Sequence, residues 1–117
     1  FNAGVRDELF PCVKEAFANV VRHSRATEVW LTVRLQEGML EVSVRDNGAG
    51  FAVHEPYAGQ GLRNFEVRMA RIGGKAQISS NVGQGTCVSF RVRTQTGESD
   101  TPSGEIQERV EVPYRYP

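Results

Sequence analysis

Residues 46–51 read DNGAGF and follow a run of alternating apolar and polar side chains. Leu40, Val42 and Val44 occupy every second position of that run. Successive strand residues point to opposite faces of a sheet, so Asp46 falls on the apolar face. A carboxylate in that position needs hydrogen-bond partners. Donors on a bound ligand can supply them, which makes the stretch a candidate floor of a ligand pocket.

Gly48 and Gly50 support this interpretation, because glycine lets the backbone turn and leaves room for a flat ligand. The same six residues also fit an ordinary polar turn with an aspartate cap, since Asp, Asn and Gly dominate turns. Taken alone, the stretch favours the turn, so the choice between a turn and a ligand pocket depends on the neighbouring segments.

The composition describes an ordinary globular chain. Its 117 residues suit one domain with a single core. Lys plus Arg equals Asp plus Glu at 14 each, so no global field attracts nucleic acid or an anionic membrane, and we expect this domain to contact neither. Cys12 and Cys87 lack metal-ligand spacing and predict buried free thiols. The chain begins abruptly in a stretch that reads as structured, so we expect a piece of a longer protein.

Residues 7–23 follow a helical pattern with Asp7 as a candidate cap. Pro11 predicts that the helix begins near it or bends there. Beside the apolar face runs a polar stripe, which consists of Glu15, Asn19 and His23 with Arg22 at its outer edge. Such a stripe is half-hidden and can line a cleft. On its own it is more typical of an ordinary amphipathic boundary.

Two alternating runs at residues 28–35 and 39–45 flank a short turn and predict an antiparallel hairpin. Residues 52–60 lack periodicity and predict a loop. The letters GQG at 59–61 then open a second helix, which ends at the glycine pair 73–74. Amides at a glycine-rich helix start can bind phosphate, but many helices begin at a glycine, so this signal is weak.

Residues 75–80 and 86–93 predict two further strands. The same parity count turns Thr86 inward, beside Asp46 if their strands are neighbours. A threonine at a strand end is common and carries little information alone. Beyond residue 93 the composition becomes rich in Thr, Ser, Gly and acidic residues. We therefore expect a domain over 1–93 and a disordered tail over 94–117, in which 106–112 can form a brief strand.

The order of these segments resembles the GHKL ATP-binding fold shared by gyrase, Hsp90, MutL and the histidine kinases. Three stretches are similar to the nucleotide-binding boxes of NarL/DesK-type sensor histidine kinases: KEAFANVVRH at 14–23, GLRNFEVRMARIGG at 61–74 and SNVGQGT at 80–86. Pro11 and Asn64-Phe65 depart from that branch's usual pattern. The resemblance implies a two-layer α/β sandwich, the Bergerat fold, with a mixed, mainly antiparallel sheet and helices on one face.

The resemblance also implies roles in binding ATP and Mg²⁺. Asp46 would accept a hydrogen bond from the adenine amine and Thr86 would support the same edge, while Gly48 and Gly50 admit the base. At the other end, Asn19 would hold Mg²⁺ with help from Glu15. The phosphate contacts would come from Arg22, His23, Gly59, Gly61 and the amide of Leu62.

The activity implied is that of the catalytic domain of a cytoplasmic sensor histidine kinase. It would pass the γ-phosphoryl group of ATP to a histidine on a separate dimerisation domain, and a response regulator would then receive it. His23 lies inside the nucleotide motif, so we do not expect it to be the acceptor. Three alternatives remain: a serine kinase of the anti-sigma type, a GHKL hydrolase with Glu15 as base, and a nucleotide-binding module without catalysis. Rossmann and P-loop assignments fit poorly because the glycine spacing differs.

Overall fold

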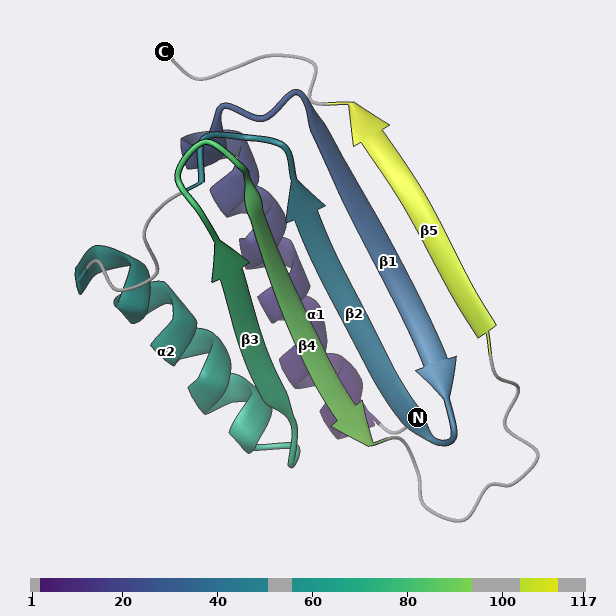
Figure 1. Cartoon of the computed structure of the whole chain (residues 1–117). Helices are drawn as coiled ribbons and strands as arrows, with labels where there is room; N and C mark the ends of the chain where they lie inside the picture. The colour runs from purple at the N-terminus through teal and green to yellow at the C-terminus, as the bar shows by residue number, and fades with distance from the viewer. Residues whose placement is uncertain (1–2, 51–55, 94–103, 112–117) are drawn as a thin grey trace.

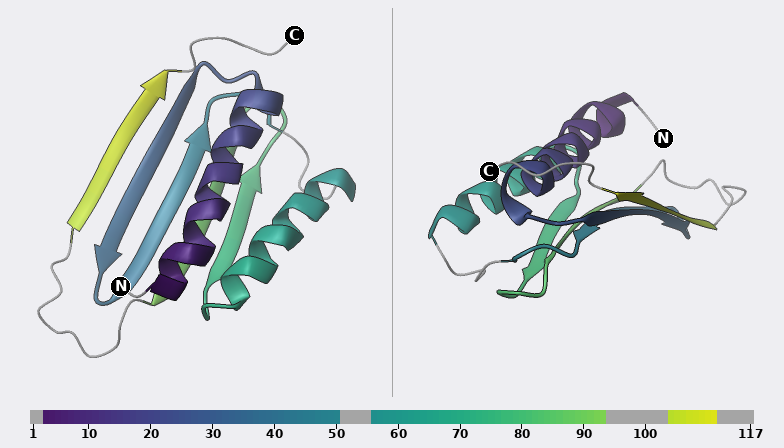
Figure 2. Two further views of the ribbon diagram at one scale, coloured as in Figure 1. Left: turned by 180° about the vertical axis from the view of Figure 1, so that it is seen from behind. Right: turned by 90° about the horizontal axis from the view of Figure 1, so that it is seen from above.

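The computed structural model describes residues 3–50, 56–93 and 104–111. They form a five-stranded sheet of order β3-β4-β2-β1-β5, with both long helices on one face (Figures 1 and 2). The elements are α1 (Ala3–Asn19), the π-helical turn η1 (Val20–Ser24), β1 (Glu28–Gln36), β2 (Met39–Asp46), α2 (Pro56–Ala70), β3 (Lys75–Ser80), β4 (Thr86–Arg93) and β5 (Gly104–Glu111). The predicted two-layer sandwich is confirmed, and the described strand pairs are all antiparallel.

Helix α1 begins at Ala3, so the prediction that Asp7 caps it is wrong. The helix also continues through Pro11, although an interior proline removes one hydrogen bond and costs about 3 kcal/mol. The apolar face explains why the helix persists. Its buried positions recur every three or four residues, at Val5, Leu9, Cys12, Ala16 and Val20. Burying one Val or Leu side chain contributes roughly 1.5–3 kcal/mol, so this face offsets the loss at Pro11.

The predicted hairpin of β1 and β2 is confirmed, and its turn explains the register. Gln36 pairs with Met39, which leaves Glu37 and Gly38 as the two turn residues. Both have positive φ, 53° and 76°, as a tight turn requires when it matches the twist of two antiparallel strands. The inward side chains of β2 are then buried in alternation from Leu40 onward.

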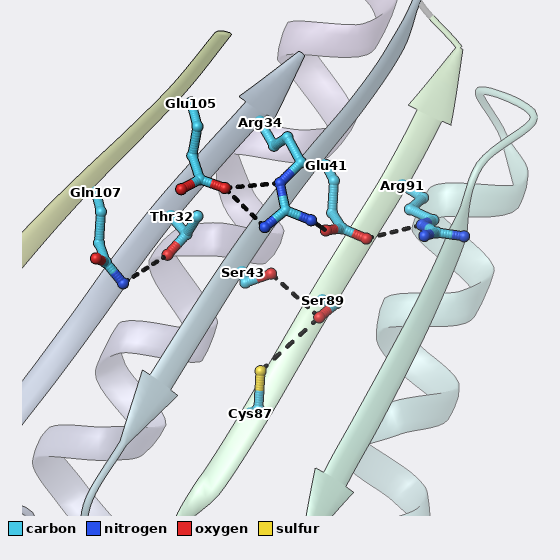
Figure 3. Close-up of polar contacts among 9 residues, drawn as sticks. All are labelled: Thr32, Arg34, Glu41, Ser43, Cys87, Ser89, Arg91, Glu105 and Gln107. Atoms are coloured by element: carbon cyan, nitrogen blue, oxygen red, sulfur yellow. Dashed lines mark hydrogen bonds and ion pairs between the residues drawn. The ribbon is translucent and has the colours of Figure 1, made fainter. Parts of the chain in front are cut away.

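The core lies between the sheet and the helices. Phe65 of α2 meets Phe90 of β4 edge to face, with ring centroids 5.2 Å apart. Met69 and Phe90 are fully buried. Cys12 is a buried free thiol as predicted, whereas Cys87 is only half-buried and lies beside Ser89 on the open face of the sheet (Figure 3). Within the described residues, neither helix combines the length and apolar character needed to cross a bilayer.

Strand β5 extends the sheet beyond the domain boundary expected at residue 93. The brief strand expected at 106–112 is present but covers Gly104–Glu111, so it includes two residues expected to be disordered. It pairs with β1 along its whole length. On the open face, Glu105 binds Arg34 at 2.7 Å and Gln107 donates to Thr32 (Figure 3). Residues 94–103 and 112–117, also expected to be disordered, lie outside the described residues.

The segment expected to be a loop at 52–60 is partly helical. Helix α2 begins at Pro56, a position where the missing N–H of proline costs nothing. Residues 51–55, which include His54, lie outside the described part of the chain. The predicted end of the helix at the glycine pair is confirmed, since Gly73 adopts φ 71° after the last turn.

The loop after β2 approaches the β3–β4 turn closely through backbone atoms. The Gly83 N–H donates to the Ala49 carbonyl. At Gly85, which has φ 80°, an added Cβ would overlap the carbonyl oxygen of Asp46. At Gly50, with φ 67°, it would overlap the carbonyl oxygen of Asn81. Glycine is therefore needed both for the backbone conformation and for the contact between the two loops.

Gly85→Ala should destabilise the fold more than Gly83→Ala. Gly83 has φ 82° and open space around it, so alanine there adds only backbone strain of about 1–2 kcal/mol. Gly85 has nearly the same φ but no room, so overpacking adds about 1–3 kcal/mol. Urea unfolding of both variants measures the difference, and equal losses would contradict the close approach of Gly85 to Asp46.

Candidate functional site

A row of side chains crosses the sheet at the end of β2. The strand registers place Val29, Asp46, Thr86 and Ser80 opposite one another in turn. Asp46 is 5% exposed and Ser80 is 7% exposed. The inward direction of Asp46 is thus confirmed, and so is its pairing with Thr86. The row brings three polar side chains together on the face that carries the helices.

Asp46 is buried, and backbone donors hold its carboxylate. The Gly48 N–H donates to Oδ1 at 2.7 Å. Burial raises the pKa of Asp46, while hydrogen bonds from the backbone of Gly48 and Thr86 lower it in part. A carboxylate has about four lone-pair sites, so two backbone bonds leave acceptor capacity for a ligand. This capacity is what an amine on a flat base needs.

Asn47 anchors the strand end that carries Asp46. Its Oδ1 accepts hydrogen bonds from the Thr27 and Glu28 amides, both at 3.0 Å, and its Nδ2 donates to Thr27 Oγ1. The Asn47 N–H also donates to the Glu28 carbonyl. The sequence pattern indicated no role for Asn47 beyond the turn. These four bonds fix the backbone directly after Asp46 and so help to aim its carboxylate inward.

Ser80 also has a place in the site. It opens the SNVGQGT stretch, but the sequence pattern indicated no separate role for it. Its Oγ donates to the Gly85 carbonyl at 3.0 Å and lies 2.8 Å from Thr86 Oγ1. The parity count that turned Thr86 inward would have found Ser80 if it had been extended across β3. Ile78 and Ala76 have the same parity, so Ser80 faces the helices as they do.

On α1, the structure brings Glu15, Asn19 and Arg22 together. Nη2 of Arg22 lies 2.8 Å from Glu15 Oε2 and 3.2 Å from Asn19 Oδ1. The helix changes to π-helical geometry directly after Asn19, a feature often found at functional sites. His23 lies in that turn, but its side chain is outside the described part. The Glu15 and Arg22 side chains are 53% and 47% exposed, so water screens this cluster.

The glycine-rich segment differs from its prediction. Gly59, Gly61 and Leu62 lie inside α2 and not in a loop that precedes it. Only the amides of the first turn of a helix lack partners within it. Pro56 has no N–H, so here these amides belong to residues 57–59. Gly61 and Leu62 therefore lie beyond the unpartnered amides in this arrangement, and their contacts with phosphate stay a prediction. The prediction took glycine as a start signal, but Pro56 starts the helix earlier.

A cavity of about 700 Å³ lies between α1 and α2. Its lining includes Glu15 together with Phe10, Phe65 and Arg68, and does not include the Asp46 row. In the part of the chain that the structure describes, no three His, Cys, Asp or Glu side chains are grouped for a metal. Glu15 and Asn19 could instead each supply one oxygen ligand to a cation. That pattern suits Mg²⁺, which keeps waters and shares its ligands with substrate phosphates.

Comparison with known proteins finds relatives among sensor histidine kinases. The chain is 36% identical over 107 residues to the sensor histidine kinase LiaS of Bacillus subtilis. The matched region covers 88% of this chain and 30% of that protein. It is 34% identical over 103 residues to the sensor protein VraS of Staphylococcus epidermidis, with coverage of 87% and 29%. The chain thus spans less than a third of either relative.

The fold is shared with a solved structure, the histidine kinase domain of the Erythrobacter litoralis EL346 blue-light activated histidine kinase. The TM-score is 0.66 at 22% identity, over 77% of this chain and 45% of that chain. The family model for the histidine kinase-, DNA gyrase B-, and HSP90-like ATPases matches residues 4–96. That span contains both the buried row and the α1 cluster, and the chain belongs to this ATPase family.

Proposed function

We propose that this chain is the ATP-binding catalytic domain of a sensor histidine kinase. It donates the γ-phosphoryl group of ATP to a histidine on a separate dimerisation domain. The observation that supports this most is the buried Asp46 carboxylate, which has backbone donors on one side and spare acceptor capacity. The family relation and the named sensor kinases among its relatives support the reaction class.

The adenine end of the proposed site is the Asp46 row. Asp46 accepts from the exocyclic amine, and Thr86 contacts the same edge directly or through one water. Gly48 is buried with its amide bonded to Asp46, so its lack of a side chain keeps the space beside the carboxylate open. Gly50 holds the loop close to the β3–β4 turn and leaves the entrance free for the base.

The phosphate end is the α1 cluster. Asn19 Oδ1 and Glu15 Oε2 would hold Mg²⁺, which supplies charge neutralisation across the phosphates. Both oxygens contact Arg22 in this structure. Arg22 therefore exchanges these contacts for phosphate oxygens, for which a guanidinium is well suited. His23, one residue further along the turn, adds a second phosphate contact.

Gly59, Gly61 and Leu62 contact the phosphates only if the first turns of α2 rearrange. Each glycine makes a helix less stable by roughly 1 kcal/mol relative to alanine. Two of them within three residues make this the part of α2 that unwinds at least cost. The proposal therefore includes a local change at the start of α2 when ATP binds.

In the full-length protein, the phosphohistidine then serves a response regulator, and we place this domain in the cytoplasm. In this structure Glu15 is ion-paired with Arg22, and its use as a hydrolytic base is one of the alternatives. The open alternatives differ in what becomes labelled, and that difference provides the test.

Mixing the chain with radiolabelled Mg-ATP and a helical domain that carries the acceptor histidine should label that domain. The label should be acid-labile and base-stable, as phosphohistidine is. Labelling of an anti-sigma antagonist on serine would instead indicate the serine kinase. Steady ATP turnover by the isolated chain that Glu15→Ala abolishes would indicate the hydrolase, and binding without any transfer would indicate the non-catalytic module.

Asp46→Asn should weaken ATP binding by roughly 10- to 100-fold. The amide keeps an oxygen for the Gly48 N–H but turns an N–H₂ donor toward the adenine amine, and a lost hydrogen bond to a charged group costs about 1.5–3 kcal/mol. Calorimetric titration measures the change. An unchanged affinity in a folded variant would reject the adenine site.

The same substitution should leave the fold as stable as the wild type or more stable at pH 7. Burial raises the pKa of Asp46 above its ordinary 3.8, so the folded chain binds this proton more tightly than the unfolded chain does. The protonated carboxyl stabilises the fold fully below pH 3.8, and this stabilisation is lost as the pH rises through the folded pKa. Thermal unfolding should therefore show a gap in favour of the Asp46→Asn variant at neutral pH, and this gap should close in acid.

Asn19→Ala should weaken binding of Mg-ATP more than binding of ATP in excess EDTA. The lost Oδ1 is a ligand of the ion in the proposed site, so the loss should be several-fold with magnesium and small without it. Titration of the wild type and the variant under both conditions separates the two effects. Equal losses would show that Asn19 contacts the nucleotide and not the metal.

A further inference from the structure

We propose that Ser80 is a positioning residue that makes the site selective for adenine over 6-oxopurines. The inference rests on the proposed function, because it concerns the base that the Asp46 row binds. It assigns Ser80 a task that is separate from holding the fold together: setting the direction of the hydrogen bonds that the row presents to the base.

Ser80 has the position this task needs. It is one of two buried polar residues in the described part of the chain, and Asp46 is the other. Thr86 lies between them in the register, opposite both. The Ser80 hydroxyl therefore reaches the Asp46 end of the row only through Thr86.

The contacts of Ser80 with Gly85 and Thr86 favour one arrangement of the protons in this row. A hydroxyl has one proton to donate and two lone pairs. The Gly85 carbonyl can only accept, so the Ser80 proton is used in the 3.0 Å bond to it. Across the 2.8 Å contact with Thr86, Ser80 must then accept, and the Thr86 hydroxyl donates. Thr86 Oγ1 has its proton turned toward Ser80 and presents only lone pairs elsewhere.

The row consequently offers side-chain acceptors to the base. Ionised Asp46 accepts, and Thr86 accepts as well. The adenine amine has two N–H donors and matches this pattern. Guanine and hypoxanthine carry a carbonyl oxygen at the same position, which would face acceptors without a donor. Sites that reject a ligand by leaving buried polar groups unpaired discriminate strongly.

A water that bridges Thr86 and the base keeps the same direction of hydrogen bonding. Water that donates one proton to Thr86 has its other proton for N1 of adenine, which is an acceptor. N1 of a 6-oxopurine carries a proton and cannot accept it. Without the Ser80 hydroxyl, Thr86 is free to rotate its own proton toward the base and to donate to a 6-oxopurine. Loss of Ser80 should therefore relax the choice of base.

The test compares ATP with inosine triphosphate, which differ only at C6 and N1 of the base. The wild type should prefer ATP by about 100-fold or more. Ser80→Ala should reduce this preference by about tenfold or more while ATP affinity falls only a few-fold. Ser80→Cys, nearly the same size with a weak S–H donor, should retain an intermediate preference.

Ser89→Ala is the matched control. Its hydroxyl lies 3.2 Å from Ser43 Oγ, joining β4 to β2 on the open face of the sheet (Figure 3). This variant breaks a hydroxyl–hydroxyl contact between the same two strands that carry Thr86 and Asp46, but does not touch the row. It should keep the wild-type preference, and thermal unfolding of all variants shows that each is folded.

The possible failures are distinguishable. If Ser80→Ala binds ATP and keeps the wild-type preference, the role of Ser80 is rejected and the adenine site stands. A proportional loss of both nucleotides also rejects it, since a merely structural residue would act in that way. If the wild type binds neither nucleotide, or if Asp46→Asn does not alter ATP binding, the proposed function fails and this inference fails with it.

Discussion

The site depends on keeping one carboxylate, that of Asp46, buried at the end of β2. Burial opposes its charged form, and backbone hydrogen bonds offset only part of that cost, so its pKa remains raised. The neighbouring backbone helps to hold Asp46 in this position. Asn47 fixes the chain directly after Asp46, and Gly85 lets the β3–β4 turn approach it. A chain selected for stability alone would place an apolar residue there, which supports the proposed role of Asp46 in binding a ligand.

Most of the sheet was predictable because its signal is local. Alternation in β1 to β4 has a period of two, and the observed strands match the predicted ones within one residue. Strand β5 was harder to predict because its partner, β1, lies some seventy residues earlier, and its exposed residues 104–107 leave little apolar pattern. The starts of both helices were misplaced for a related reason. Pro11 is a local signal against helix, but the packing of the apolar face keeps α1 helical there. Gly59 and Gly61 also disfavour helix, but α2 has already begun at Pro56.

The candidate site was predictable where it depended on parity and less so where it depended on side-chain geometry. Counting along two strands is enough to turn Asp46 and Thr86 inward, and they become neighbours once β2 pairs with β4. Ser80 follows from the same count on a third strand. The contact of Arg22 with both Glu15 and Asn19 does not follow from spacing alone, since it requires the π-helical turn after Asn19 and one particular rotamer of a long side chain.

The Asp46 row and the α1 cluster, the two ends of the proposed site, differ in exposure, and this difference suits them to different tasks. At the row, Asp46 and Ser80 are buried, so an unmatched hydrogen bond is costly, and in the proposed site the direction of each proton decides which base fits. At the α1 cluster, both partners are about half exposed, and such ion pairs contribute only about 0–1 kcal/mol. Arg22 can therefore leave Glu15 and Asn19 at little cost. Rigid recognition of the base and easy exchange of contacts at the phosphates suit a domain that must hold a nucleotide by one end while releasing a phosphoryl group from the other.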